Sequence, residues 1–131
     1  MAEVSVRLKG DTRLIGSIQS RSVDTLGLAL GKEVMALVQA SMIVLVTDFE
    51  GYRLSARNQL PGTVIRIHEG AVNVDVVIEL PGGDLISASI SGQSYNDLAL
   101  TPGSPVTAVF KSSALIMAGL RSYSESSATD D

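Results

Sequence analysis

The stretch DVVIELPGGDLISASISGQSYNDLALTPGSPVTAVFKSSALIM, residues Asp75–Met117, repeats an earlier part of the same chain. It aligns without a gap on EVSVRLKGDTRLIGSIQSRSVDTLGLALGKEVMALVQASMIVL, residues Glu3–Leu45, so that each residue falls 72 positions after its counterpart. Identical pairs include Val4/Val76, Leu8/Leu80, Gly10/Gly82, Ile18/Ile90, Ser22/Ser94, Leu26/Leu98, Leu28/Leu100, Gly31/Gly103, Val34/Val106, Ala36/Ala108 and Ser41/Ser113. This many ungapped matches indicate two copies of one small module.

The second copy has residues at its front that the first copy lacks. Residues 55–74 precede the matched part of the second copy, whereas the first copy would need them before Met1. The sequence therefore predicts a first module (residues 1–50) without its opening strand, a complete second module (51–118) and a disordered, Ser- and acid-rich tail (119–131). Because a missing strand exposes unpaired N–H and C=O groups, we expect either a late start of the chain or a neighbouring subunit that supplies the strand.

Each module is expected to be built of short strands. Five segments of the second module have strand composition: Thr63–Ile67, Val72–Leu80, Leu85–Ile90, Pro105–Phe110 and Ala114–Ala118, of which the last two are expected to close the module. Ser91–Gly103 accommodates a helix of one or two turns. The sequence therefore predicts an all-β fold of tandem OB-like barrels. Since a module of roughly 65 residues is marginally stable by itself, we also expect a homo-oligomer.

Composition excludes several kinds of chemistry. The chain has no Cys and a single His, His68, which excludes thiolate sites, Cys nucleophiles and His clusters. Its carboxylates are dispersed and no P-loop spacing is present, so we expect no enzyme and no directly coordinated metal. Ten Lys and Arg against 14 Asp and Glu give a net charge of −4, and aromatic residues make up only 4%. Both values argue against an OB-type nucleic-acid binder.

The first ten residues, MAEVSVRLKG, carry three charges and no long apolar run, so they do not predict a signal peptide. No stretch approaches the roughly 20 apolar residues of a membrane span. We therefore expect a cytoplasmic protein that does not bind membranes.

Hydroxyl, amide and cationic side chains gather just outside the apolar strands of the second module. They form three groups: Ser55, Arg57 and Asn58; Ser91, Gln93 and Ser94; Lys111, Ser112 and Ser113. These groups supply hydrogen-bond donors and positive charge without a carboxylate, which is what a tetrahedral dianion requires. The alternative interpretation is that they are solvated strand ends. Asn58 and His68 are expected to have structural roles.

Three motifs resemble a known family. SARNQLPGTV (Ser55–Val64), EGAVN (Glu69–Asn73) and VTAVFKSS (Val106–Ser113) are similar to the Mop domain, the molybdate-binding module of the molbindins. GKEV and VQAS (Gly31–Val34 and Val38–Ser41) match it in the first copy, so the resemblance covers residues 2–118. The whole pattern resembles di-Mop proteins and the C-terminal half of the molybdate-responsive transcription regulator. The resemblance implies TOBE-type, OB-like barrels that exchange strands, assemble around a threefold axis or as dimers, and bind molybdate or tungstate between subunits. For this chain we expect a trimer or a hexamer-like homo-oligomer.

The resemblance also implies which residues would hold the anion. In the second module these are Ser55, Ala56, Arg57, Ser91, Ser94, Lys111 and Ser112, with Ala56 and Ser112 acting through backbone N–H groups. The backbone amides of Ala71, Val72 and Asn73 would form a second type of site. The corresponding site of the first module is degenerate: it keeps Ser22, has Gln19 in place of Ser91, Gln39 in place of Lys111 and Ala40 in place of Ser112.

These expectations combine into one function and one alternative. The first is a cytoplasmic molybdate- or tungstate-binding protein for molybdenum storage or homeostasis, which holds the anion by hydrogen bonds at subunit interfaces. The alternative is a molybdate-sensing module of a transcription regulator or transporter ATPase that acts through a partner chain.

Overall fold

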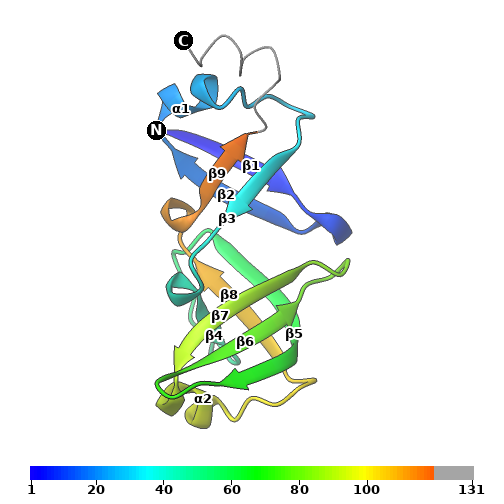
Figure 1. Cartoon of the computed structure of the whole chain (residues 1–131), viewed down its shortest axis with the longest axis vertical. Helices are drawn as coiled ribbons and strands as arrows, with labels where there is room; N and C mark the ends of the chain where they lie inside the picture. Colours follow the sequence, from blue (N-terminus) through cyan, green and yellow to red (C-terminus); the bar gives the residue numbers. More distant parts are fainter. Residues whose placement is uncertain (120–131) are drawn as a thin grey trace.

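The structure is a computed structural model, and it describes residues 1–119 of the chain. The strands are β1 (Ala2–Arg7), β2 (Arg13–Ile18), β3 (Val34–Leu37), β4 (Val44–Val46), β5 (Asn58–Glu69), β6 (Asn73–Glu79), β7 (Leu85–Ser91), β8 (Pro105–Phe110) and β9 (Ile116–Gly119). The helices are α1 (Ser20–Thr25) and α2 (Gly92–Leu98), and the 3-10 turns are η1 (Lys9–Asp11), η2 (Ala40–Met42) and η3 (Ser112–Ala114). The predicted tail, apart from Gly119, lies outside the described residues. The molecule is elongated, with the first repeat at one end and the second at the other (Figure 1).

A five-stranded sheet is built on the second repeat, with four strands of that repeat and β4 from the first. Its strands are antiparallel and follow the order β4-β8-β5-β6-β7. Contacts between β4 and β7 close the sheet on itself. Strand β5 is longer than the predicted segment 63–67, because it begins at Asn58 and pairs with β8 along its first half and with β6 along its second half. A register shift between Val64 and Arg66 bends it from one partner to the other.

The two repeats exchange their last strands. Strand β9 of the second repeat pairs with β3 of the first, and β4 of the first repeat pairs with β8 of the second. The two pairings are equivalent, since Leu37↔Ile116 and Val109↔Val44 are related by the same shift of 72 positions. The expectation that Ala114–Ala118 closes its own module is therefore wrong. Sequence periodicity identified the strand but carried no information about which of two similar sheets it joins. The module limits stay a prediction.

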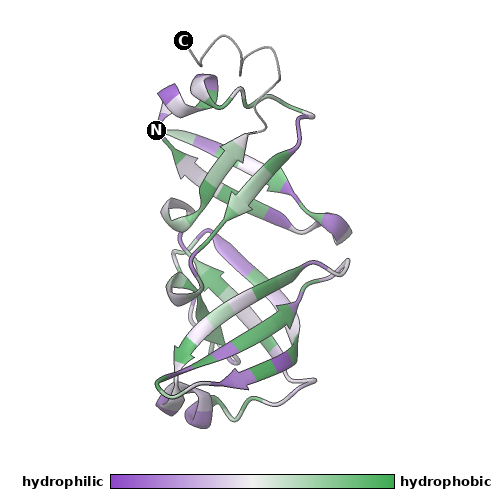
Figure 2. Cartoon of the chain, viewed as in Figure 1, coloured by the Kyte–Doolittle hydropathy of each residue, from purple (hydrophilic) through white to green (hydrophobic). Residues whose placement is uncertain are grey.

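The core follows the alternation of the strands. In β6, Val74, Val76 and Ile78 are buried, and the residues between them are exposed or half-buried. Leu45 next to β8 and Leu115 and Met117 at β9 are buried as well, so the exchanged segments fill the core of the repeat that receives them. Hydrophobic colour runs along the strands of both halves, whereas α1 and α2 are hydrophilic (Figure 2).

A buried asparagine joins the second repeat to the first. The side chain of Asn58 is 1% exposed; its Oδ1 accepts from the N–H of Ile15, and its Nδ2 donates to the carbonyl of Ile15, both at 2.8 Å. Asn58 therefore bonds to the free edge of β2 as a neighbouring strand would. The predicted structural role of Asn58 is confirmed, although its partner lies 43 residues away and is not its own local backbone.

Replacing Asn58 by Ala should destabilise the fold. The substitution removes two hydrogen bonds and leaves the Ile15 N–H and C=O without partners, which should lower the free energy of unfolding by about 2–4 kcal/mol. Chemical denaturation of the full chain measures this change. The exposed Asn96→Ala in α2 is the matched control and should change stability by less than about 0.5 kcal/mol. Equal stability of the two variants would show that the Asn58 bonds contribute little.

Candidate anion-binding site

The two predicted cations, Arg57 and Lys111, leave the same strand pair at the same end. The last residue pair of the β5–β8 ladder is Asn58↔Phe110, and Arg57 and Lys111 are the next residues outward on the two strands. Both are exposed, and Ser112 begins η3 directly after Lys111. The structure therefore brings together two of the three predicted groups of donors, those that contain Arg57 and Lys111, near the middle of the molecule where the two repeats meet (Figure 1).

Gln59 holds the segment that precedes Arg57. Its Nε2 donates to the carbonyls of Leu54, at 3.2 Å, and Ala56, at 2.9 Å. These bonds fold the Ser55–Arg57 segment back toward β5, so that the predicted donors follow the strand in a defined conformation. Sequence reasoning missed Gln59 as a positioning residue, because nothing in the sequence distinguishes it from any exposed polar residue on a strand.

A carboxylate contacts Arg57. Nη1 and Nη2 of Arg57 donate to Oε2 and Oε1 of Glu3 at 2.6 and 3.1 Å, and the two side chains are 54% and 53% exposed. The expectation of a donor group without an acid is therefore wrong for this chain. Glu3 lies in β1 of the first repeat, and only the packing of the two repeats brings it to Arg57. An anion that used Arg57 would have to displace Glu3 or share the guanidinium with it.

The predicted hydroxyls Ser91 and Ser94 lie elsewhere. Ser91 ends β7 and caps α2: its Oγ accepts from the N–H of Ser94 at 3.1 Å and donates to Ser94 Oγ at 3.0 Å. Both residues are exposed at the far end of the second repeat, where α2 lies (Figure 1). Within one chain the structure does not bring them to Arg57 and Lys111, so their part in an anion site stays a prediction.

The residues of the predicted second site lie beside this hydroxyl pair. Ala71, Val72 and Asn73 form the turn between β5 and β6, all three are exposed, and Asn73 pairs with Ser91. The Gly70 N–H donates to the Asn73 carbonyl at 2.8 Å and closes the turn. The end of this turn therefore lies beside Ser91 in the β6–β7 pair, which the sequence alone did not indicate.

The degenerate residues of the first repeat take equivalent places. Gln19 and Ser22 lie at the start of α1 as Ser91 and Ser94 do in α2, and Gln39 and Ala40 lie at η2 as Lys111 and Ser112 do at η3. Neither Gln19 nor Gln39 caps its helix with a side-chain hydrogen bond. The first repeat thus repeats the local backbone of the α2 and η3 starts, with Gln39 in place of the cation Lys111.

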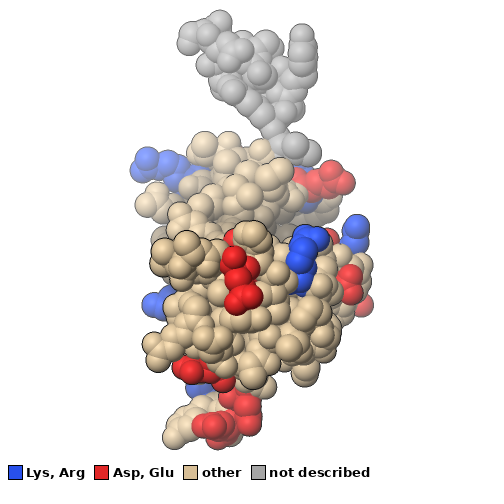
Figure 3. All heavy atoms as spheres, turned by 60° about the horizontal axis from the view of Figure 1, so that its bottom comes forward, with Lys and Arg blue, Asp and Glu red and all other residues tan. Residues whose placement is uncertain are grey.

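Charge on the surface is mixed. On the face seen in Figure 3, Lys and Arg are scattered among Asp, Glu and uncharged residues, without a continuous basic area. Within residues 1–119, no group of three or more His, Asp or Glu side chains is placed to hold a metal ion. In the same part of the chain, no helix has both the length and the apolar character needed to cross a membrane.

The duplicated OB-like barrel with short helical turns defines the class of protein. A family model, the TOBE domain, matches residues 54–117. Among solved structures, that of the cytoplasmic molybdate-binding protein ModG with molybdate bound superposes with a TM-score of 0.86 and 42% sequence identity, covering 90% of this chain and 84% of ModG. The chain belongs to the Mop (molbindin) family of TOBE-type molybdate-binding proteins.

Two curated relatives extend the comparison. The molybdenum transport protein ModE of Herbaspirillum seropedicae is 40% identical over 116 residues, which are 88% of this chain and 43% of that protein. The molybdenum-pterin-binding protein MopA of Rhodobacter capsulatus is 39% identical over 117 residues, covering 89% and 44%. The chain therefore spans less than half the length of these relatives.

The Arg57–Glu3 pair should contribute little to stability. It is half exposed, and exposed ion pairs are typically worth about 0.2–1 kcal/mol. A double-mutant cycle with Glu3→Gln and Arg57→Gln, followed by chemical denaturation, should give a coupling energy in that range that shrinks at high salt. A coupling of several kcal/mol would show that the pair is a main support of the contact between the repeats.

Proposed function

We propose that this chain binds molybdate, and the chemically similar tungstate, as an intact oxyanion and does no chemistry on it. The observation that carries the proposal is the common position of Arg57 and Lys111 just beyond the Asn58↔Phe110 pair. Two cations and the backbone N–H of Ser112 are offered there, and charge-assisted hydrogen bonds of this kind are the strong ones for an oxyanion. ModG, whose described structure holds molybdate, supports the choice of ligand.

We propose further that a complete pocket needs more than one chain. Ser91 and Ser94 lie at the far end of the second repeat from Arg57 and Lys111, so one chain does not surround an anion with all the predicted donors. In a homo-oligomer such as a trimer or hexamer, the α2 end of one copy would meet the Arg57 end of another. Discrimination against sulfate would follow from size. The S–O bonds are shorter than Mo–O bonds, so the sulfate oxygens lie closer together and cannot reach every donor.

The role we propose is storage or homeostasis of molybdenum in the cytoplasm. A sensing role is the second candidate, favoured by the match to about two-fifths of ModE, a protein named in other species as a transcriptional regulator. In that role the chain would report the anion to a partner that acts on DNA or on transport. Isolation of a stoichiometric DNA-binding or ATPase partner would favour sensing.

Removing either cation should weaken anion binding. Arg57→Gln and Lys111→Gln each delete charged donors worth about 1.5–3 kcal/mol, which corresponds to a loss of affinity of roughly 10- to 100-fold. Titration calorimetry with molybdate, tungstate and sulfate measures the affinities. Arg66→Gln removes an exposed cation from the middle of β5 and serves as the matched control. Equal binding of all three anions, or an equal loss in the control, would contradict the proposal.

Removing the competing carboxylate should have the opposite effect. Glu3→Gln releases Arg57 from an exposed ion pair worth up to about 1 kcal/mol, so molybdate affinity should rise by up to roughly fivefold. The same titration measures this gain, and Glu69→Gln, an exposed acid at the other end of β5, should change the affinity much less. A lower affinity in Glu3→Gln would show that the pair positions Arg57 for binding instead of competing with it.

A further inference from the structure

The side chain of Gln59 orders the main chain that leads to the proposed anion site. Its Nε2 donates to the carbonyl of Leu54 at 3.2 Å and to the carbonyl of Ala56 at 2.9 Å. A carboxamide nitrogen carries two N–H groups, so these two bonds use all of its donors. Carbonyl oxygens only accept, and the Nε2 end of the amide is therefore the end that must face them. Two carbonyls just before Arg57 are thus turned toward one side chain.

The same two bonds fix the direction of two main-chain N–H groups. In a trans peptide, the C=O of one residue and the N–H of the next point in opposite directions, and no peptide bond in the described part of the chain is cis. The carbonyl of Leu54 points at Gln59, so the N–H of Ser55 points away from it. The carbonyl of Ala56 directs the N–H of Arg57 in the same way. Both N–H groups therefore face the side of the segment opposite Gln59.

The β5–β8 ladder does not use the N–H of Arg57. The N–H of Val64 donates to the carbonyl of Ser104 at 2.9 Å, which marks these opposite residues as a hydrogen-bonded pair. Hydrogen-bonded and non-hydrogen-bonded pairs alternate along an antiparallel ladder. Counted from that pair, Gln59 lies in a non-hydrogen-bonded pair, and Arg57 falls in the next such position, opposite Lys111. The N–H of Arg57 therefore points away from β8.

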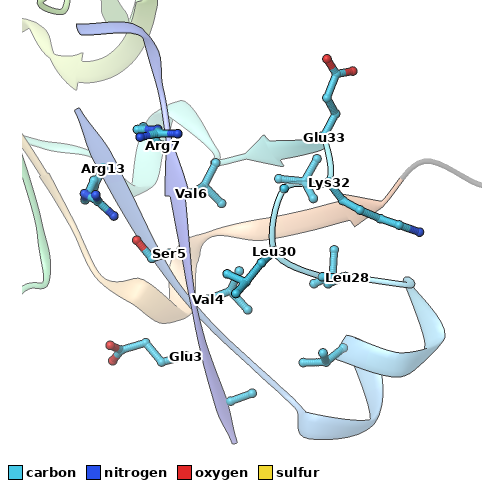
Figure 4. Close-up of a pocket in the computed structure, with 15 residues that line it drawn as sticks. Glu3, Val4, Ser5, Val6, Arg7, Arg13, Leu28, Leu30, Lys32 and Glu33 are labelled. Atoms are coloured by element: carbon cyan, nitrogen blue, oxygen red, sulfur yellow. The ribbon is translucent and has the colours of Figure 1, made fainter. Parts of the chain in front are cut away.

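Arg57 offers two kinds of donor, and only its side chain is engaged. The guanidinium binds Glu3, which extends from β1 away from the apolar side chains of Val4 and Leu30, at the border of a groove of about 1080 Å³ (Figure 4). Within the described residues, the N–H groups of Ser55 and Arg57 have no hydrogen-bond partner. Both residues are exposed, so these N–H groups are open to a ligand even while Glu3 holds the guanidinium.

We propose that Gln59 is a positioning residue of the anion site and that the main-chain N–H groups of Ser55 and Arg57 donate to the bound oxyanion. This inference rests on the proposed function, because it concerns the same ligand. Gln59 turns away two carbonyl oxygens that would repel a dianion, and it directs two N–H groups to the opposite side. Oriented main-chain N–H groups are known anion-binding elements, and donors that are ordered before binding avoid the entropic cost of ordering them.

The geometry assigns other N–H groups than the resemblance implied. The resemblance gave Ala56 as the residue of this segment that acts through its backbone N–H. That N–H belongs to the peptide between Ser55 and Ala56, which neither bond of Gln59 orients. The proposal therefore separates Ser55 and Arg57 from Ala56, and the three amides can be measured individually.

The first test is amide hydrogen exchange of the full chain, followed residue by residue by NMR with and without saturating molybdate. Exchange at Ser55 and Arg57 should slow by at least about tenfold, because their N–H groups become hydrogen-bonded. The Ala56 amide should keep its rate. Slowing at Ala56 alone, or at none of the three, would overturn the assignment of the donors.

The second test replaces the carboxamide in the full chain. Gln59→Met and Gln59→Glu keep the length of an exposed side chain, so both variants should fold. Methionine cannot donate, and molybdate affinity measured by titration calorimetry should fall roughly 5- to 50-fold, the loss expected for two hydrogen bonds. Glutamate should lose more, because its carboxylate repels both carbonyls and the anion. Thr63→Val, an exposed polar-to-apolar change on the same strand, is the matched control and should keep the affinity of the parent.

Chemical denaturation of the same variants separates positioning from general support of the strand. If Gln59 only supported the end of β5, its variants would lose stability while the folded protein kept its molybdate affinity, and the proposal would be overturned. Positioning predicts instead that affinity falls and that Ser55 and Arg57 lose their protection by molybdate in Gln59→Met.

The outcomes also separate this inference from the proposed function. If the unsubstituted chain does not bind molybdate, the proposed function fails and this inference fails with it. If the chain binds molybdate and Lys111→Gln weakens binding, whereas Gln59→Met leaves the affinity unchanged, only the role of Gln59 is refuted.

Discussion

The fold depends on the exchange of the last strands between the two repeats. Leu45 next to β8 and Met117 at β9 fill the core of the repeat that receives each strand, so each repeat supplies one strand and part of its core to the other. A module of this size buries little apolar surface alone, and sharing strands enlarges the core that both use. The two halves are therefore expected to unfold as one unit, because separating them would remove a strand from each.

The same exchange determines the surroundings of the candidate site. It carries β1 and β2 of the first repeat to the beginning of β5, where Asn58 bonds to Ile15 and Arg57 meets Glu3. The end of the second repeat proposed to bind the anion is thus formed partly by the first repeat. The first repeat has Gln39 in place of Lys111, but it still contacts this end of the second repeat through Ile15 and Glu3.

Much of the fold could be predicted from the sequence because the repeat is ungapped and its strands alternate. The OB-like fold and the short helix after Ser91 both follow from that pattern. The destination of β9 could not be predicted, since both sheets offer nearly the same edge. The Glu3–Arg57 contact was also hidden, because the two residues are 54 positions apart and meet only through packing of the repeats. Lys111 was singled out as a cation just outside an apolar strand and through the resemblance of VTAVFKSS to the Mop domain, and its part in an anion site stays a prediction.

The most direct test of the central claim is the anomalous diffraction of a crystal soaked in tungstate. The account predicts a tungsten peak within hydrogen-bond distance of Arg57, Lys111 and the Ser112 N–H, with Ser91 and Ser94 of a neighbouring copy on its other side. A crystal whose tungsten peaks lie elsewhere, with Arg57 and Lys111 facing solvent in every copy, would contradict it.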